Sequence, residues 1–386
     1  MAKIKGPFDL PKLPAKIDYS ELVDQVTKAH AALARLDEMF KHISNPALIE
    51  QTFLTQEAVL SSKIEGTQVT LEDVLKQEAE KGGEHIEESS EKGRDIKEVW
   101  NYRRAFRMGL DMINAGESLA ENNIKKLHKA LLQSVRGKTR APGEFRKDQV
   151  HIGPPGTPMS EARYIPPIAS SIPGLYSNFD RYFNTPGAEK DPLVQIAIAH
   201  YQFEAIHPFK DGNGRVGRLL IPLFLYKRGI ISSPLMYVSQ YFEENRRDYY
   251  DLLSDVSYKD AWVPWIRFFL HGLCVQANKA SEVGRAITVL RDEHRKHLSE
   301  YKSTYAYAVL DAMFAQPYFT PNMIARSSGV KNKQTILNLI AKFTAAGILK
   351  DISPHRKRNK VYVFEELTNL LDNHERGSTQ KTQSTR

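Results

Sequence analysis

The chain has 386 residues, of which 41% are hydrophobic, 54 are Lys or Arg and 46 are Asp or Glu. This length predicts two or three domains, and the apolar fraction is ordinary for a globular protein. The single cysteine, Cys274, excludes an intramolecular disulfide and a zinc site of paired cysteines, and its apolar surroundings favour a buried thiol. The longest apolar stretch, at 219–226, falls short of the ~20 residues that span a bilayer. Residues 1–14 lack the apolar segment of a signal peptide, so we expect a cytoplasmic protein without a membrane span.

Charge is unevenly distributed along the chain, whose formal net charge is +8. Residues 301–386 hold 13 Lys or Arg and 6 Asp or Glu, so nearly all of the positive excess lies near the C-terminal end. Any nucleic-acid partner is therefore expected to bind this segment.

Apolar residues recur mostly at helical spacing, which predicts a mainly α-helical protein. In chain order, helices are expected over 20–45, 51–66, 96–113, 124–135, 192–206, 214–228, 240–254 and 260–280, followed by a charged amphipathic helix at 281–301. Thr70 and Asp73 form a capping-box pattern ahead of a further helix. Residues 80–95 are polar and contain glycine, and they predict a flexible connection.

Residues 140–175 differ from their surroundings because they contain seven prolines and a short alternating stretch. They predict a small β-hairpin or extended flap on the surface. From residue 303 the pattern changes to helix, short helix, turn, helix and hairpin. Residues 372–386 have almost no apolar content and are expected to be disordered.

Residues 207–218 read HPFKDGNGRVGR and follow the apolar helix that ends at Ile206. Gly212, Asn213 and Gly214 let the backbone turn tightly before the next helix begins. Backbone N–H groups at such a glycine-rich helix start point outward, and the helix dipole favours negative charge there. The segment therefore predicts an anion site.

Four side chains of this segment add chemistry to the anion site. Arg215 and Arg218 lie one turn apart and can hold phosphate oxygens. Asp211 supplies a hard oxygen ligand suited to Mg²⁺, which binds through one or two carboxylates together with substrate phosphates. His207 can accept a proton near neutral pH. A base, a metal ligand and a phosphate site in one short segment favour a catalytic function over a plain turn.

The segment HPFKDGNGRVGR resembles the signature of the Fic family, HxFx(D/E)GNGRxxR, at every specified position. The resemblance extends through 98–106, 124–132, 149–167 and 239–253 and covers 20–370. It implies a Fic-type helical core with a small β-hairpin flap, plus a C-terminal winged-helix domain. The implied domains are an N-terminal helical region with an inhibitory helix at 1–95, a Fic catalytic domain at 96–290, a winged helix-turn-helix domain at 300–371 and the disordered tail.

Members of this family are protein adenylyltransferases, which move AMP from ATP onto a hydroxyl of a target protein. By this resemblance, His207 would be the general base toward a Ser, Thr or Tyr hydroxyl, and Asp211 would hold Mg²⁺ on the α- and β-phosphates. ATP would be bound by the rest of the segment, namely Gly212, Asn213, Gly214, Arg215, Val216, Gly217 and Arg218. Catalysis would consist mainly of positioning and electrostatic stabilisation. The flap would align the target by pairing with an extended segment.

The sequence SSKIEG at 61–66 matches the family's inhibitory pattern, (S/T)xxxE(G/N), at the end of the helix expected over 51–66. The resemblance implies that Glu65 pairs with Arg218 in bidentate geometry and withdraws it from the γ-phosphate. Ser61 is expected only to support the end of this helix. The alternative is that Glu65 is a solvated helix residue without a regulatory role.

Tyr241 and Asn245 lie one turn apart in a segment similar to one that lines the adenine pocket of the family. An aromatic face and an amide can stack on a purine and hydrogen-bond to it. The alternative is a core tyrosine beside a surface asparagine.

The module at 303–371 looks like a winged helix. Thr320 begins its short helix, 327–329 forms a turn, and KNKQT at 331–335 opens a recognition-like helix. The basic segment HRKRNK at 355–360 would be the wing. DNA binding through 320–360 and contacts with a protein are both open for this module.

The sequence thus predicts an Mg²⁺-dependent protein adenylyltransferase that uses ATP, modifies target proteins and itself, and is inhibited by Glu65. The alternative is a winged-helix DNA-binding regulator whose Fic domain senses nucleotide. The presence of His207 favours the enzyme, because a pure sensor needs no base. A homodimer is left open, and the target protein is not defined by the sequence.

Overall fold

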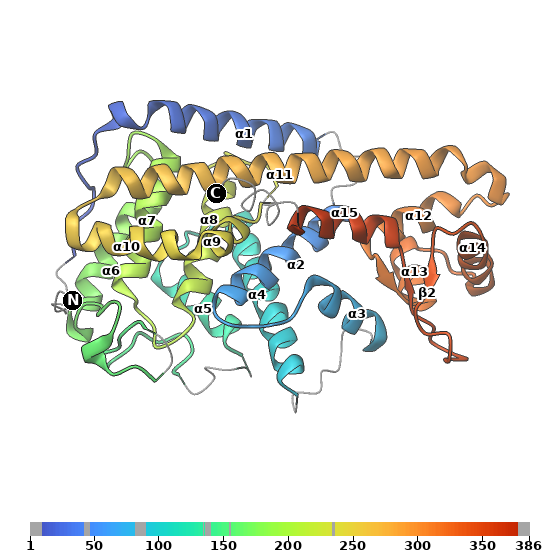
Figure 1. Ribbon diagram of the computed structural model, residues 1–386, viewed down its shortest axis with the longest axis horizontal. Coiled ribbons are helices and arrows are strands. Elements are labelled where there is room, and N and C mark those ends of the chain that lie inside the picture. Colours follow the sequence, from blue (N-terminus) through green and yellow to red (C-terminus); the bar gives the residue numbers. More distant parts are fainter. Residues whose placement is uncertain are drawn as a thin grey trace, which may run out of the picture. The chain divides into compact units, whose positions relative to one another are not determined.

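The computed structural model describes residues 10–41, 47–81, 90–133, 135, 140–153, 156–233 and 236–376. These residues form mostly helices and one small antiparallel sheet of three strands, which confirms the predicted fold class (Figure 1). The helices are α1 (Val23–Lys41), α2 (Ala47–Ile64), α3 (Leu71–Lys81), α4 (Glu91–Asn114), α5 (Glu121–Leu131), α6 (Ile172–Asn184), α7 (Pro192–Ile206), α8 (Asn213–Lys227), α9 (Ser239–Glu244), α10 (Arg246–Lys259), α11 (Trp262–Lys296), α12 (Ala306–Ala315), α13 (Pro321–Ser328), α14 (Lys333–Ala345) and α15 (Glu365–Arg376). Short 3₁₀ helices lie at Tyr19–Glu21, Met159–Glu161, Ala169–Ser171 and Leu298–Tyr301, and the strands are β1 (Tyr318–Phe319), β2 (Lys350–Asp351) and β3 (Tyr362–Val363).

The chain divides into two compact units that do not follow the order of the sequence. The first, here called the catalytic unit, comprises Met1–Ala34, Glu57–Gln68 and Lys97–Ala277. The second comprises Arg35–Gln56, Val69–Ile96 and Asn278–Arg386. The end of α2 that carries SSKIEG therefore belongs to the catalytic unit, together with α5 to α10.

Helix α7 forms the centre of the catalytic unit and packs against α6 and α8 (Figure 1). Its sequence is apolar on every side, and nearly all of its residues are buried, as expected for a helix surrounded by others. Asp191 caps its start by accepting hydrogen bonds from the N–H groups of Leu193 and Val194 at 2.8 and 3.3 Å. Helix α7 therefore fixes the position at which the 207–218 segment begins.

The second unit contains the sheet, whose strand order is β1-β3-β2. Helix α3 packs on this sheet through a buried cluster of Leu71, Leu75, Ala79, Tyr318, Val361 and Val363. The predicted capping box at the start of α3 is confirmed, because the N–H of Thr70 donates to Asp73 and the N–H of Asp73 donates to the Thr70 hydroxyl, both at 3.1 Å.

The order of elements from α12 to β3 agrees with the predicted module of short helix, turn, helix and hairpin. Thr320 caps α13, and the Asn332 side chain caps α14 by accepting from the N–H groups of Gln334 and Thr335. Two of the four basic residues expected to contact phosphates are already paired in this unit: Lys360 with Asp351 at 2.7 Å and Arg356 with Glu80 at 3.5 Å. These ion pairs reduce the positive charge that the segment offers to DNA.

The helices depart from the prediction in three places. Helix α4 begins at Glu91, so the end of the 80–95 segment expected as a flexible connection is helical. The segment expected as one helix at 240–254 is broken at Asn245, where α9 ends and α10 begins. In contrast, the helices expected at 260–280 and 281–301 are one continuous helix, α11, of 35 residues. Gly284 does not interrupt α11, and the Met39 side chain packs so closely on it that a Cβ would not fit.

The expected hairpin of the flap is reduced to a single antiparallel bridge between Ile152 and Tyr164. Most of the remaining flap backbone is irregular, since its prolines cannot donate ladder hydrogen bonds. Helix α15 continues to Arg376, beyond the start of the tail expected at 372, and 377–386 lie outside the described residues. Cys274 is only partly buried, so the expectation of a buried thiol is wrong.

None of the helices in the described part of the chain is long and apolar enough to cross a membrane.

Candidate active site

Residues 207–212 form a tight loop between α7 and α8, and 213–218 form the first turns of α8. His207 follows α7 directly and adopts a left-handed conformation, with φ 49° and ψ 60°. Gly212, at φ 76°, reverses the chain again and stands immediately before α8. Asn213, the first residue of α8, closes the loop: its amide donates to the carbonyl of Phe209 and its oxygen accepts from the N–H of Phe209, both at 2.9 Å. Asn213 therefore shapes the predicted anion site through its side chain.

His207 is held in the form that can accept a proton. Its Nδ1 lies 3.3 Å from the carbonyl oxygen of Glu204, which can only accept, so Nδ1 carries the hydrogen and Nε2 is free to act as the base. The pKa of His207 is lowered to about 4, mainly by burial and in part by the nearby charge of Arg146. The imidazole is therefore neutral at physiological pH.

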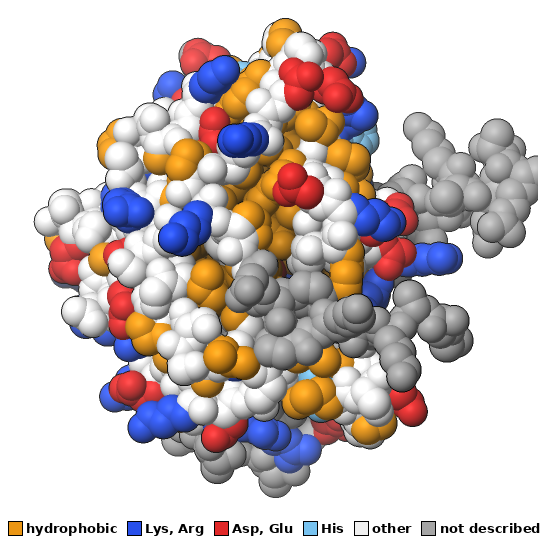
Figure 2. All heavy atoms as spheres, turned by 90° about the vertical axis from the view of Figure 1, so that its left-hand side faces the viewer, with side chains coloured by type: hydrophobic (Ala, Val, Ile, Leu, Met, Phe, Trp, Pro, Cys, Tyr) orange, Lys and Arg blue, Asp and Glu red, His pale blue; other side chains and the backbone are white. Residues whose placement is uncertain are grey.

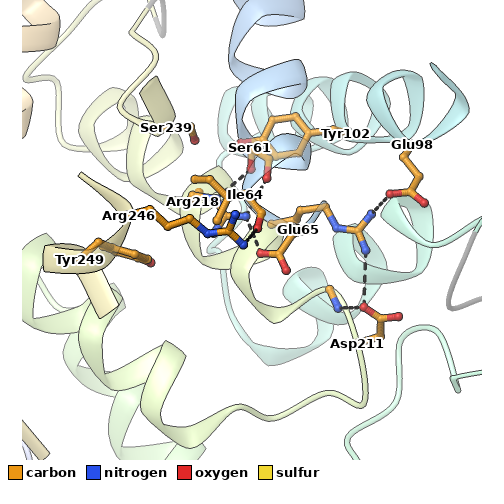
Figure 3. Close-up of polar contacts among 12 residues, drawn as sticks. Ser61, Ile64, Glu65, Glu98, Tyr102, Asp211, Arg218, Ser239, Arg246 and Tyr249 are labelled. Atoms are coloured by element: carbon orange, nitrogen blue, oxygen red, sulfur yellow. Dashed lines mark hydrogen bonds and ion pairs between the residues drawn. The ribbon is translucent and has the colours of Figure 1, made fainter. Parts of the chain in front are cut away.

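Asp211 and Arg215 lie at the start of α8, beside a residue that the sequence did not single out. The Asp211 Oδ1 accepts from the N–H of Gly212 at 2.6 Å and lies 3.6 Å from the Arg215 guanidinium. Arg215 is buried and pairs with Glu98 of α4 at 2.9 Å, so its charge is already compensated (Figure 3). It stabilises the start of α8 instead of pointing freely toward a phosphate.

The donor set around Asp211 fits Mg²⁺ and not an all-protein metal cage. No group of three or more His, Cys, Asp or Glu residues that could hold a metal occurs among the described residues. Asp211 is partly exposed and offers a carboxylate next to the helix start. Mg²⁺ commonly binds in this way, through one or two carboxylates, substrate phosphates and water.

Arg218 is fully enclosed by the end of α2 (Figure 3). Its Nη2 donates to Glu65 Oε1 at 2.7 Å and to the carbonyl of Ser61 at 2.9 Å, and its Nε donates to the Ser61 hydroxyl at 3.0 Å. The expected pairing of Glu65 with Arg218 is present, but it is not bidentate, because only Nη2 meets the carboxylate and Nε donates to Ser61. Ser61, the other residue of the predicted inhibitory pair, thus contacts Arg218 directly in addition to lying at the helix end.

The Glu65 carboxylate lies over the first turn of α8. A Cβ added at Gly214 would collide with Glu65 Oε1 and lie 2.8 Å from Arg218 Nη1, so only glycine leaves room for this contact. Burial alone would raise the pKa of Glu65, but the charges of Arg218 and Arg215 outweigh it and keep this pKa below its ordinary value. A second arginine, Arg246, donates to the carbonyl of Ile64 at 2.7 Å and also holds this helix end.

Val216 and Gly217 face the interior of the catalytic unit. Val216 is fully buried, and a Cβ at Gly217 would collide with Glu204 and lie 3.3 Å from His200. These two residues of the predicted ATP-binding set therefore serve to pack α8 against α7.

Tyr241 and Asn245 make contacts within their own part of the fold. The Tyr241 ring packs on Phe268 and His271 of α11, with centroids 5.0 and 5.7 Å apart, and lies against Gly272. The Asn245 amide donates to the carbonyl of Tyr241 at 2.9 Å, which caps the end of α9. These contacts agree with the alternative of a packing tyrosine and a local asparagine.

A pocket that sequence reasoning missed lies between the flap, α7 and α10. It encloses about 440 Å³ of space, part of it open to solvent. Its walls are Ile152, Arg163 and Tyr164 of the flap, Tyr201, Glu204 and Ala205 of α7, and Tyr250, Leu253, Ser254 and Ser257 of α10. Figure 2 shows the side of the molecule on which α6 and α10 lie in Figure 1, with hydrophobic side chains gathered along a hollow and charged ones around it.

Glu204 gives this pocket a polar wall. Its Oε1 is buried and has no hydrogen-bond partner among the described residues. Burial raises the pKa of Glu204 to about 8, so the carboxyl is mostly protonated at neutral pH and can donate a hydrogen bond. The sequence FEAIHPF could have indicated Glu204 as a functional residue, since an acidic residue in an otherwise apolar helix is unusual.

Comparison with known proteins agrees with this site. Residues 23–111 match the family described as "Fic/DOC family N-terminal", and 118–225 match "Fic/DOC family". The protein adenylyltransferase Fic of Aedes aegypti is 30% identical over 161 residues, which are 41% of this chain and 28% of that protein. That of Culex quinquefasciatus is 27% identical over 259 residues, which are 64% of this chain and 44% of that protein.

Solved structures show the same fold. A Fic family protein from Desulfovibrio desulfuricans aligns over 91% of this chain and 97% of its own, with a TM-score of 0.58 and 21% identity. Fic-1 from C. elegans aligns over 70% of this chain and 75% of its own, with a TM-score of 0.52 and 21% identity. The chain belongs to the Fic/DOC family. It spans less than half the length of the curated adenylyltransferases named above.

Proposed function

We propose that this protein is a protein adenylyltransferase, which transfers AMP from ATP to a hydroxyl group of a target protein and of itself. The observation that carries the proposal is the loop between α7 and α8. It holds a neutral His207 close to a helix start that favours anions and bears Asp211 and Arg218. The relatives named adenylyltransferases support the same activity.

In the proposed reaction, Nε2 of His207 takes the proton of the target hydroxyl. The hydroxyl oxygen forms a bond to the α-phosphorus of ATP, the bond from this phosphorus to the bridging oxygen breaks, and pyrophosphate leaves. Asp211 would hold Mg²⁺, which neutralises charge on the α- and β-phosphates. Asn213 and Gly214 offer backbone N–H groups to the phosphates, and Arg218 offers its charge to the γ-phosphate once Glu65 has withdrawn.

The pocket between the flap and α10 would take the nucleoside. Its walls combine an aromatic side chain, Tyr250, with apolar carbons and the protonated carboxyl of Glu204. A purine can stack on the first and accept a hydrogen bond from the last. This proposal replaces the expectation that Tyr241 and Asn245 bind the adenine, because Tyr241 packs on α11 and Asn245 caps the end of α9.

We further propose that the module from α12 to β3 is a winged helix and that the protein acts in the cytoplasm. The order of the elements supports the first statement. The competing function, a DNA-binding regulator that senses nucleotide, is not favoured, because ion pairs hold two of the expected phosphate-binding residues and the relatives are named as enzymes.

The activity is tested by incubating the protein with a cell lysate and ATP that carries the label on either the α- or the γ-phosphate. Compared with the lysate alone, transfer of AMP predicts additional labelled bands, including the enzyme itself, from the α-label and no additional bands from the γ-label. Labelling from the γ-phosphate alone would identify a kinase, and labelling from neither would contradict the proposal.

Replacing Asp211 with alanine is expected to lower AMP transfer by about 100-fold or more, because the charge of the phosphates would lose its metal partner. Calorimetric titration provides a second readout. The wild-type protein should bind ATP more tightly with Mg²⁺ than with EDTA, and Asp211→Ala should lose this difference. Asp148→Ala, which removes an exposed carboxylate paired with Lys210, is the matched control. An unchanged Mg²⁺ effect in Asp211→Ala would assign the metal to another group.

A further inference from the structure

Arg146 occupies an unusual position between the flap and the catalytic loop. It is only 3% exposed, yet its guanidinium pairs with no carboxylate of the described residues. Burying a charge without such a partner is costly unless other polar groups surround it. In this protein those groups are backbone carbonyls.

The guanidinium reaches the carbonyls at the end of α7. Its Nε donates to the carbonyl of His207 at 2.9 Å, and its Nη2 lies 3.4 Å from that of Ile206. The N–H of Arg146 itself donates to the carbonyl of Pro208 at 2.8 Å. The last carbonyls of a helix lack partners within the helix and carry partial negative charge, so a cation is favourable there.

The same side chain also holds both ends of the flap. Its Nη1 donates to the carbonyl of Asp148 at 3.0 Å, and its Nη2 donates to that of Pro167 at 2.5 Å. Between Asp148 and Pro167 lies the bridge that joins Ile152 to Tyr164. One planar guanidinium, with donors in a fixed fork, therefore connects the backbone of His207 to both ends of the flap.

We propose that Arg146 is a positioning residue that sets the distance and orientation between the flap and His207. This inference rests on the proposed function, in which a target segment pairs with the flap and presents its hydroxyl to His207. The phosphate site does not depend on these contacts, because none of them reaches α8 or the end of α2; of the nucleotide site, only the proposed nucleoside pocket shares the flap. Loss of Arg146 should therefore impair transfer more than nucleotide binding.

Arg146 also acts on the base electrostatically. Burial is the main cause that lowers the pKa of His207, and the positive charge of Arg146 adds to it, whereas the hydrogen bond to the carbonyl of Glu204 and the charge of Glu65 raise it. Removing the arginine charge should raise this pKa. Because the neutral imidazole is the active form, the loss of activity at acidic pH should then begin at a higher pH.

The test compares Arg146→Gln and Arg146→Lys in the Glu65→Gly protein, with auto-modification by α-labelled ATP as the assay. We expect both variants to label at least tenfold more slowly while their Kd for Mg²⁺-ATP stays within twofold. Arg146→Gln should also shift the acidic limb of the pH profile upward, whereas Arg146→Lys, which keeps the charge but not the fork, should not. Lys147→Ala, which removes an exposed neighbouring charge, should label like the parent.

The outcomes separate this inference from the proposed function. If the Glu65→Gly parent shows no labelling from the α-phosphate, the proposed function itself is wrong. If the parent labels and a folded Arg146→Gln variant labels within twofold of it, only the positioning role is wrong. Should Arg146→Gln fail to fold, as judged by circular dichroism, Arg146→Lys decides: an unchanged rate in that variant would overturn the inference.

Discussion

The Glu65→Gly protein is expected to transfer AMP to itself and to targets roughly ten- to a hundredfold faster than the wild type. A hydrogen bond to a charged group contributes about 1.5–3 kcal/mol, and each 1.4 kcal/mol is about tenfold in rate. Arg218 is 1% exposed, and Glu65 is the carboxylate that meets its guanidinium. Without Glu65, the charge of Arg218 becomes available to the γ-phosphate. The measurement is the initial rate of labelling at saturating Mg²⁺-ATP.

Further variants separate charge from helix structure. Glu65→Gln keeps the size of the side chain and removes its charge, so it should activate in part. Ser61→Ala removes one of the contacts to Arg218 and should activate less than Glu65→Gly. Lys63→Ala, an exposed change on the same helix turn, should have no effect. The gain of Glu65→Gly should vanish when Arg218→Ala is added, and equal rates for Glu65→Gly and wild type would show that the helix end has no inhibitory role.

Removing the base should have the opposite effect. In the Glu65→Gly protein, His207→Ala is expected to reduce AMP transfer by about 10²–10⁴-fold, the usual contribution of a general base. The Kd for Mg²⁺-ATP should change little, since the imidazole acts on the hydroxyl and not on the nucleotide. Labelled-ATP transfer and calorimetry measure the two quantities. His355→Ala, an exposed histidine of the second unit, is the control, and undiminished labelling by His207→Ala would disprove the assignment.

The pH profile gives an independent check on the same residue. The pKa of His207 lies near 4 in the folded protein, well below that of a free imidazole, so the base form predominates above this pH. Transfer should therefore stay constant from neutral pH to about pH 5 and fall only as the pH approaches 4. A decline centred near 6.5 would mean that the imidazole is not buried in the active protein.

Local signals in the sequence were sufficient to predict the central part of the site. These signals are the apolar helix before His207, the glycines at 212 and 214 and the capping residues of α3, α13 and α14. Each of them determines the structure of only the few residues beside it, so its spacing is visible in the sequence. The break at Asn245 was missed because its side chain bonds the carbonyl of Tyr241 and competes with the helix, a choice that tertiary context decides.

The supporting residues of the site could not be predicted in this way. Glu98 meets Arg215 across 117 positions of sequence, and Arg146 meets His207 across 61. Such pairs are brought together only by the packing of α4, the flap and α8. The spacing of apolar residues along the sequence does not reveal this packing. For the same reason Tyr250 was overlooked, since its role depends on the flap that lies opposite it.

The left-handed backbone of His207 has a consequence for the stability of the whole chain. The position directly after a helix is commonly occupied by glycine, because a residue with a Cβ is strained there by about 1 kcal/mol. A glycine at 207 would relieve that strain, but its greater freedom in the unfolded chain would offset the gain, and it would remove the imidazole. The strain at this position is therefore the cost of placing a base directly after α7.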